Sequence, residues 1–126
     1  MNLDDGSALT AFRLRRADGT ALWDGGSWHS ASGITRNFPN GSVHFSPVRH
    51  WTSPLTGALY PVEWQVDTPA GPWRVRARLD AQELDSRQST GAVYWEGLSE
   101  LIHAQGHRCG QGYLEMTGYA APLRLG

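Results

Sequence analysis

The sequence predicts an all-β protein, an antiparallel β-barrel of about eight to ten short strands. Short runs in which apolar and polar residues alternate recur about every ten residues, which is typical of half-buried strands. Glycine, proline, asparagine and aspartate cluster between these runs, as turns require. No segment shows the periodicity of a long helix. At 126 residues the chain is long enough to bury a core, and we expect one domain over residues 1–126.

The first half of the chain contains several strand candidates separated by turns. Asp-Gly pairs at 5–6 and 18–19 predict tight turns. Residues 24–26, Asp-Gly-Gly, predict a break or bulge, and residues 37–41, which end in Asn-Gly, predict a loop. The strand candidates between them are residues 7–16, 20–23, 28–35 and 42–51.

The middle of the chain contains the clearest strand. Residues 51–61 hold two prolines and a glycine, so we expect a bend or crossover there, because proline cannot donate to a central ladder. Val62, Trp64 and Val66 then alternate with polar residues. Residues 73–79 place four apolar side chains on one face and three arginines on the other, namely Trp73, Val75, Ala77 and Leu79 against Arg74, Arg76 and Arg78. Residues 80–90 predict a short strand or one helical turn.

Two final runs, 92–98 and 112–119, predict a hairpin joined by a glycine-rich turn. The second run alternates polar or aromatic residues with apolar or small ones, Tyr113, Glu115, Thr117 and Tyr119 against Leu114, Met116 and Gly118. A face that combines tyrosines with a glutamate suits a polar cavity lining or a wet surface. We expect function to lie in this hairpin.

Composition narrows the classes of partner. A net charge of −1 argues against nucleic acid and anionic membranes as partners. The six tryptophans, four tyrosines and three phenylalanines can line an apolar pocket or fill a barrel core. The single cysteine, Cys109, leaves no internal disulfide and no thiolate metal cage. No apolar run is long enough for a membrane span, and the first residues lack the features of a signal peptide, so we expect a cytoplasmic location.

Glu96 is the best candidate for acid–base chemistry. It stands between Trp95 and Gly97, and a carboxyl group among aromatic rings loses hydration, which raises its pKa toward that of a general acid. Alternation puts Tyr94 on the same face, and Glu115 can pair with Glu96 across the hairpin. The alternative is that both glutamates occupy ordinary solvent-facing strand positions.

A metal site is disfavoured. Glu100, His103 and His107 would align on a helix, but Gly106 and Gly110 interrupt one and the flanking pattern is that of strands. We therefore expect neither a metal nor another cofactor.

Four segments together resemble the lipocalin-like family that holds the carotenoid 1,2-hydratases and the AttH-type predicted secreted hydrolases. Their order and spacing extend across nearly the whole chain. The segments are Leu-Asp-Asp-Gly at 3–6 with Ala-Phe-Arg-Leu-Arg at 11–15; Trp-Thr-Ser-Pro at 51–54 with Thr-Gly at 56–57 and Tyr-Pro-Val-Glu-Trp at 60–64; Tyr-Trp-Glu-Gly at 94–97; and the run from Gly110 to Tyr119.

The resemblance implies a lipocalin-like barrel that corresponds to the C-terminal half of a two-domain protein. It implies an activity on an isoprenoid or polyene, either the addition of water to a double bond or a ring closure. The family motif residues present here are Tyr94, Glu96, Trp64, Tyr113 and Glu115. We expect Glu96, Tyr94 and Glu115 to be catalytic and five aromatic residues to bind the ligand, namely Trp64, Tyr60, Trp95, Tyr113 and Tyr119.

Two classes of function stay open at this point. In the first, a bacterial hydratase or cyclase of carotenoid or terpenoid biosynthesis uses Glu96 to protonate an alkene while aromatic rings shield the cation. In the second, the barrel is a non-catalytic half-domain that binds an apolar ligand or has a structural role. We expect an apolar small molecule as partner, no nucleic acid, and either a homodimer or a missing N-terminal barrel domain. The position of Glu96 relative to the cavity discriminates between the two classes.

Overall fold

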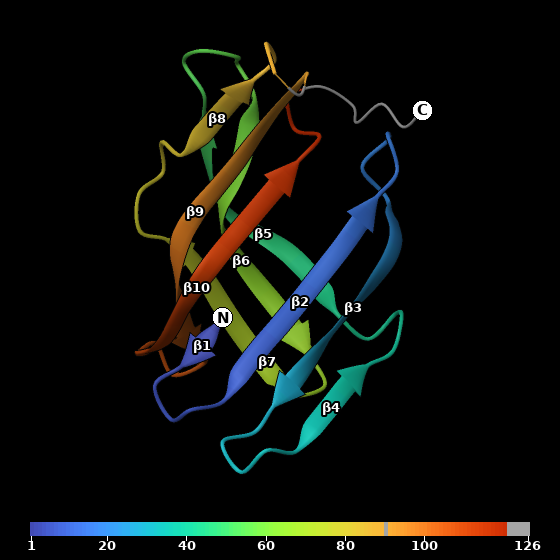
Figure 1. Cartoon of the computed structure of the whole chain (residues 1–126), viewed down its shortest axis with the longest axis vertical. Coiled ribbons are helices and arrows are strands. Elements are labelled where there is room, and N and C mark those ends of the chain that lie inside the picture. Colours follow the sequence, from blue (N-terminus) through green and yellow to red (C-terminus); the bar gives the residue numbers. More distant parts are fainter. Residues whose placement is uncertain (90, 121–126) are drawn as a thin grey trace.

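The computed structural model describes residues 1–89 and 91–120, and every regular element in these residues is a β-strand (Figure 1). No helix in this part of the chain has the length and hydrophobicity needed to cross a membrane. The ten strands are β1 (Asn2–Leu3), β2 (Ala8–Arg15), β3 (Ala21–His29), β4 (Thr35–Phe38), β5 (His44–Thr52), β6 (Leu59–Thr68), β7 (Gly71–Ala77), β8 (Glu83–Ser86), β9 (Ala92–His103) and β10 (Arg108–Thr117).

The strands form one antiparallel sheet that curls around a common core. Their order is β4-β3-β2-β1-β10-β9-β7-β6-β5, and β8 pairs with the first residues of β9. Strand β9 joins two parts of the sheet, because its first four residues pair with β8 and its last five with β7. This curled half-barrel confirms the all-β antiparallel class that the alternation predicted.

The hairpin predicted near the C-terminus is present and is the longest in the fold. Strands β9 and β10 pair from Tyr94–Thr117 to Ile102–Arg108, with a bulge at Cys109. The turn is closed by hydrogen bonds from the Gly106 amide to the His103 carbonyl (2.8 Å) and from the His103 amide to the His107 carbonyl (2.9 Å). Gly106 has φ of 93°, a left-handed conformation that glycine adopts without a Cβ clash.

The core is built by the inward residues of β6, β7 and β9. The predicted inward positions Val62, Trp64 and Val66 are all buried, and so are Trp73, Val75 and Ala77. The prediction was wrong for Leu79, which is 62% exposed, because β7 ends at Ala77. The arginines of β7 lie on the outer face as predicted, where they form ion pairs with glutamates, for example Arg76 with Glu100 at 3.1 Å.

Strand β2 places its charged side chains inward and its large apolar side chains outward. Arg13 and Arg15 are partly buried toward the barrel interior, whereas Phe12 and Leu14 are exposed. The ring of Phe12 covers Gly25 of β3, where a Cβ would meet it at 3.0 Å. The outer face of β2 and β3 is therefore unusually apolar.

Two local predictions differ from the structure, and at two further segments the structure shows which of two predicted alternatives is present. Strand β3 runs unbroken through residues 24–26, where a break or bulge was predicted. The backbone of Gly26 passes so close to Thr10 that no Cβ would fit, and glycine allows this close approach. Residues 37–38, predicted as loop, belong to β4. For residues 51–61, where we expected a bend or a crossover, the structure has a bend: residues 53–58 join β5 and β6 as a hairpin, and Pro61 belongs to β6. The polar segment after residue 80 contains a strand, β8, and no helical turn.

Candidate functional site

Aromatic side chains line the barrel interior from one end to the middle. Trp28 of β3 and Trp73 of β7 stack with ring centroids 5.6 Å apart and planes inclined by 18°. One level further in, Phe45 of β5 meets Trp64 of β6 edge-on at 5.9 Å. These residues come from strands that are distant in the sequence, and the curl of the sheet brings them together.

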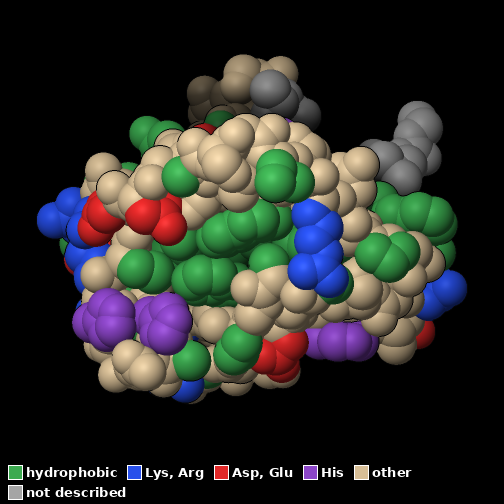
Figure 2. Space-filling model, turned by 90° about the horizontal axis from the view of Figure 1, so that it is seen from below, with side chains coloured by type: hydrophobic (Ala, Val, Ile, Leu, Met, Phe, Trp, Pro, Cys, Tyr) green, Lys and Arg blue, Asp and Glu red, His purple; other side chains and the backbone are tan. Residues whose placement is uncertain are grey.

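A cavity of about 460 Å³ opens at the end of the barrel that holds Trp28 and Trp73. Figure 2 shows this end, with hydrophobic side chains gathered in a hollow and acidic, basic and histidine side chains around it. We call this region the mouth. It is lined by Leu3, Asp4, Asp5, Trp28, Ala70, Trp73, His103, Arg108 and Cys109. An apolar floor with a few polar groups at the rim is the usual composition of a small-molecule site.

Several polar groups at the rim of the mouth contact one another. Arg108 pairs with Asp4 at 3.3 Å, and the rings of His103 and His107 stack at 5.1 Å. Burial, followed by the charges of Asp4 and Asp5, raises the pKa of the Cys109 thiol, so little reactive thiolate forms near neutral pH. In the described residues no group of three potential ligand side chains is arranged to hold a metal ion.

A second cavity of about 140 Å³ lies between β2 and β10. Met1, Leu9, Thr10 and Ala11 line one side, Tyr113 and Leu114 line the other, and Phe45, Trp64, Val66 and Val75 form its floor. Its walls thus include outward residues such as Thr10 and inward residues such as Trp64. The cavity therefore passes through the barrel wall.

Two tryptophans beside the cavities carry indole N–H groups that have no acceptor. The Nε1 atoms of Trp64 and Trp73 are buried and make no hydrogen bond to any described residue. A buried donor left unpaired costs about 1–3 kcal/mol.

Arg13 supplies a cation to the interior, a feature that the sequence reasoning missed. Its guanidinium lies over the rings of Phe45 and Trp64, at 5.6 and 5.4 Å from their centroids, and donates to the Phe45 carbonyl at 3.5 Å. Among the described residues Arg13 forms no ion pair with a carboxylate, unlike Arg74 and Arg76 of β7. The alternation of β2 was visible in the sequence, but an inward arginine beside an outward phenylalanine contradicts the usual choice of face.

The opposite end of the barrel carries a polar network centred on Glu83 of β8, which sequence reasoning also missed. Its carboxylate accepts hydrogen bonds from the hydroxyls of Ser53 (2.6 Å), Thr56 (2.7 Å) and Tyr60 (2.7 Å). We call these four residues the clasp. Although partial burial raises the pKa of Glu83, the bonds from Ser53, Tyr60 and Thr56 outweigh it, and the net shift is downward. Burial and the bond to Glu83 raise the pKa of Tyr60.

The predicted ligand-binding aromatics occupy three different places. Trp64 lines the cavity of about 140 Å³ between β2 and β10, and Tyr113, 72% exposed, stands at its outer rim. Trp95 is completely buried and donates from Nε1 to the Asp80 carbonyl at 2.7 Å. Tyr60 is buried in the clasp, and Tyr119 packs against it at 5.8 Å. The structure thus brings Trp64 and Tyr113 to a cavity and places the other three in the packing of the core.

The predicted catalytic residues lie together, but away from both cavities. Glu96 pairs directly with Glu115 across β9 and β10, and Tyr94 pairs with Thr117. All three stand on the face opposite Trp95, because the fully buried Trp95 ring points inward and successive strand residues alternate. Neither cavity is lined by Glu96, Tyr94 or Glu115.

The comparison with known protein families gives one clear result. The AttH-like family matches residues 1–119. The chain belongs to the AttH-like family. A crystal structure from Nitrosomonas europaea that bears the AttH name is 47% identical and superposes with a TM-score of 0.89. The match covers 94% of this chain and 37% of that one, so the present chain spans just over a third of this AttH-like relative.

This match confirms the family resemblance and the lipocalin-like fold that the four sequence segments implied. A search of the curated proteins gives no match to this chain. The family and fold therefore describe a lipocalin-like protein.

Proposed function

We propose that this AttH-like barrel binds an apolar small molecule through its mouth. The observation that carries the proposal is the stacked Trp28–Trp73 pair in a cavity of about 460 Å³, a volume within the usual range for ligand sites. Phe45 and Trp64 continue the aromatic surface inward. An elongated or ring-containing hydrocarbon is the ligand class that suits such a surface.

The polar groups near this surface favour a ligand that carries an oxygen atom. The buried indole N–H groups of Trp64 and Trp73 and the guanidinium of Arg13 are all donors. No carboxylate contacts Arg13 within ion-pair distance in the described residues. A hydroxyl, carbonyl or carboxyl oxygen on an otherwise apolar ligand, such as an oxygenated isoprenoid, would accept from these groups.

Two substitutions on the same strand test this proposal. Trp28→Ala removes one ring of the mouth, and Trp23→Ala removes a ring that is 52% exposed on β3. Binding of Nile red, an uncharged apolar dye, is measured by fluorescence titration. We expect Trp28→Ala to weaken binding about tenfold, equivalent to ~1.4 kcal/mol, and Trp23→Ala to leave it unchanged. Equal affinities for both variants would exclude the mouth as the site.

The narrower hypothesis of a hydratase or cyclase assigns proton donation to Glu96. The family resemblance supports this hypothesis, whereas the position of Glu96 beside Glu115 on the outer face favours the binding alternative. The test is Glu96→Gln: a catalytic role requires loss of alkene hydration or cyclisation with unchanged dye binding. If wild type shows no turnover and the variant binds dye normally, the barrel acts as a binding domain.

We also propose that a second barrel covers the outer face of β2 and β3. Phe12, Leu14 and Trp23 expose apolar surface there, and contiguous apolar surface commonly marks an interface. The second barrel is either another copy of this chain or an N-terminal barrel domain. A dimer mass in light scattering that Leu14→Glu reduces to a monomer mass supports the copy, and a wild-type monomer at high concentration favours the domain.

A further inference from the structure

Arg36 of β4 stands at the rim of the mouth. It pairs directly with Trp28 across β3 and β4, and side chains paired in this way lie on one face of the sheet. That face is the inner one, because Phe38, two residues further along β4, belongs to the buried core. Arg36 itself is exposed, so its side chain begins on the inner face beside Trp28 and ends in solvent at the end of the barrel.

One hydrogen bond holds the guanidinium of Arg36 close to the floor of the mouth. Its Nη1 donates to the Pro69 carbonyl at 3.0 Å. Pro69 lies in the turn between β6 and β7, next to Ala70, which lines the mouth. The guanidinium is therefore held between β4 and this turn. A ligand that rests on the Trp28 and Trp73 rings has its outer end within reach of Arg36.

The charge of Arg36 is not neutralised by a neighbouring acid. Within residues 1–89 and 91–120 no carboxylate lies within ion-pair distance of it. Arg108, which also lines the mouth, differs in this respect, because it pairs with Asp4 at 3.3 Å and approaches Glu100 at 3.9 Å. A guanidinium has five N–H donors in a rigid fork that matches a carboxylate, and the Pro69 carbonyl accepts from only one of its nitrogens.

The acids of the mouth come from another part of the sheet. Asp4 and Asp5 line the mouth from the turn between β1 and β2, whereas Arg36 belongs to β4, two strands beyond β2 in the sheet order. An anionic group on a ligand is therefore attracted toward the β4 side and repelled from the β1 side. A doubly charged group is repelled more strongly than a singly charged one.

We propose, building on the ligand site proposed above, that Arg36 binds a carboxylate at the outer end of the apolar ligand, so that the ligand is a long-chain or isoprenoid monocarboxylic acid. The apolar part rests on the stacked rings of Trp28 and Trp73. The carboxylate oxygens accept hydrogen bonds from the guanidinium nitrogens that Pro69 leaves unused. Arg36 thus determines specificity by charge, and no bond is made or broken.

Three ligands with one carbon skeleton measure the contribution of the charge. Geranic acid carries a carboxylate, geraniol a hydroxyl group and geranylamine an ammonium group. Their affinities are measured at pH 8, where a carboxylic acid is ionised, by displacement of Nile red from the wild-type chain. We expect geranic acid to bind about fivefold more tightly than geraniol, and geranylamine to bind more weakly than either. The preference for the acid should shrink at high salt, because exposed charges are screened.

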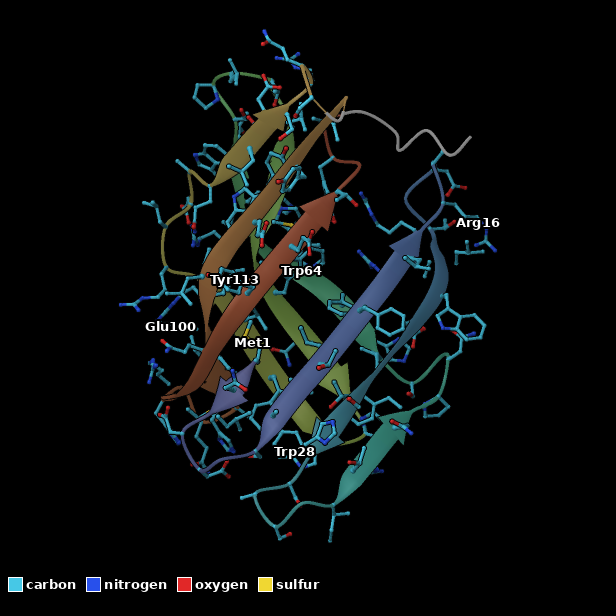
Figure 3. The ribbon with its side chains drawn as sticks, viewed as in Figure 1. Met1, Arg16, Trp28, Trp64, Glu100 and Tyr113 are labelled. Carbon is cyan, nitrogen blue, oxygen red and sulfur yellow. The ribbon has the colours of Figure 1, made fainter. Side chains whose placement is uncertain are left out.

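Three variants test whether Arg36 causes this preference. Arg36→Gln removes the charge but keeps an amide that can donate to Pro69, and geranic acid should then bind no more tightly than geraniol. Arg36→Lys keeps the charge and should retain most of the preference. Arg16→Gln is the matched control, because Arg16 is also exposed and donates to a backbone carbonyl, that of Ala21, at 2.8 Å. Figure 3 shows Arg16 at the opposite end of the barrel from Trp28, so this variant should bind all three ligands like wild type.

Equal affinities of geranic acid and geraniol in the wild type would overturn the proposal, and so would a preference that survives in Arg36→Gln. In both cases geraniol would still displace Nile red, so the apolar site itself would stand. If neither geraniol nor Nile red binds, the proposed function and the role of Arg36 fail together. Geranyl phosphate, which carries a second charge, should bind no more tightly than geranic acid, and tighter binding would overturn the assignment of a carboxylate.

Discussion

The two ends of this AttH-like barrel differ in how their polar groups are satisfied. At the clasp one carboxylate accepts three hydroxyl hydrogen bonds, and Tyr60 is fully buried. At the mouth two stacked tryptophans border a cavity of about 460 Å³, and the Trp73 indole N–H is buried without an acceptor among the described residues.

The difference indicates which end is structural and which end can bind. A satisfied network of short bonds fixes the turn between β5 and β6 against β8, and none of its members lines either cavity. A hydrogen bond from a ligand acceptor to an unsatisfied donor beside open apolar surface removes the penalty of the unpaired donor and so favours binding. Substitutions at the clasp should therefore change stability, and substitutions at the mouth should change binding.

The largest effect is expected from Glu83→Leu. It leaves the hydroxyls of Ser53, Thr56 and Tyr60 without their acceptor, and we expect a loss of about 2–4 kcal/mol in the free energy of unfolding. Urea denaturation measures this change, and Nile red binding at low urea should be unaltered. Glu115→Leu, at an exposed position of β10, is the matched control and should change stability little. Similar losses in both variants would contradict the structural role of the clasp.

The stability should fall in acid because of Glu83. Its folded-state pKa lies below its ordinary value of 4.5, so its contribution is present above the unfolded pKa and is lost as pH falls through the folded pKa. Tyr60 acts at the other extreme: its pKa is raised, so its contribution is complete below pH 10 and declines above it. Melting temperatures across pH should show a Glu83→Gln variant with a weaker acid dependence than wild type.

The alkylation rate of Cys109 should report on the mouth, with an effect of intermediate size. Its thiol pKa is raised, so alkylation by iodoacetamide should be several-fold slower near pH 7 than for a free cysteine and should speed up at higher pH. Because Cys109 lines the mouth, a bound apolar ligand should slow the reaction further. Alkylation that is indifferent to ligand would place the ligand elsewhere.

The smallest effect is expected on the outer face. Arg76 pairs with Glu100 at 3.1 Å, with about half of its side chain exposed, and such a pair contributes about 0–1 kcal/mol. Arg76→Ala should therefore lower the free energy of unfolding by about 0.5 kcal/mol and leave binding unchanged. A loss comparable to that of Glu83→Leu would show that the outer ion pairs, and not the clasp, stabilise this part of the sheet.

The sequence predicted the strands well where alternation and burial agree. Val62, Trp64 and Val66 face inward, and the β9–β10 hairpin closes at Gly106 as its glycine-rich turn indicated. The face of Tyr94 and Glu96 could not be chosen from alternation alone, because both Trp95 and the pair beside it were plausible cavity linings. The structure shows which face is inward. The large Trp95 ring is fully buried, so Tyr94 and Glu96 on either side of it turn outward.

The sites that were missed depend on contacts between distant segments. Glu83 meets Ser53 and Thr56 across 30 and 27 residues, and no local pattern signals that meeting. Trp28 meets Trp73 only because β3 and β7 lie on opposite sides of the curled sheet. The inward position of Arg13 was not predicted, because arginines usually face solvent. Here the rings of Phe45 and Trp64 cover its guanidinium.

The most direct test of the central claim is an NMR titration that observes the indole Nε1–H signals. The probe is β-ionone, an apolar isoprenoid ketone with one acceptor oxygen. Binding at the mouth predicts saturable shifts for Trp28 and Trp73, with the signal of the exposed Trp23 unmoved. Shifts confined to Trp23, or no saturable shift at Trp28 and Trp73, would contradict a ligand site at the mouth.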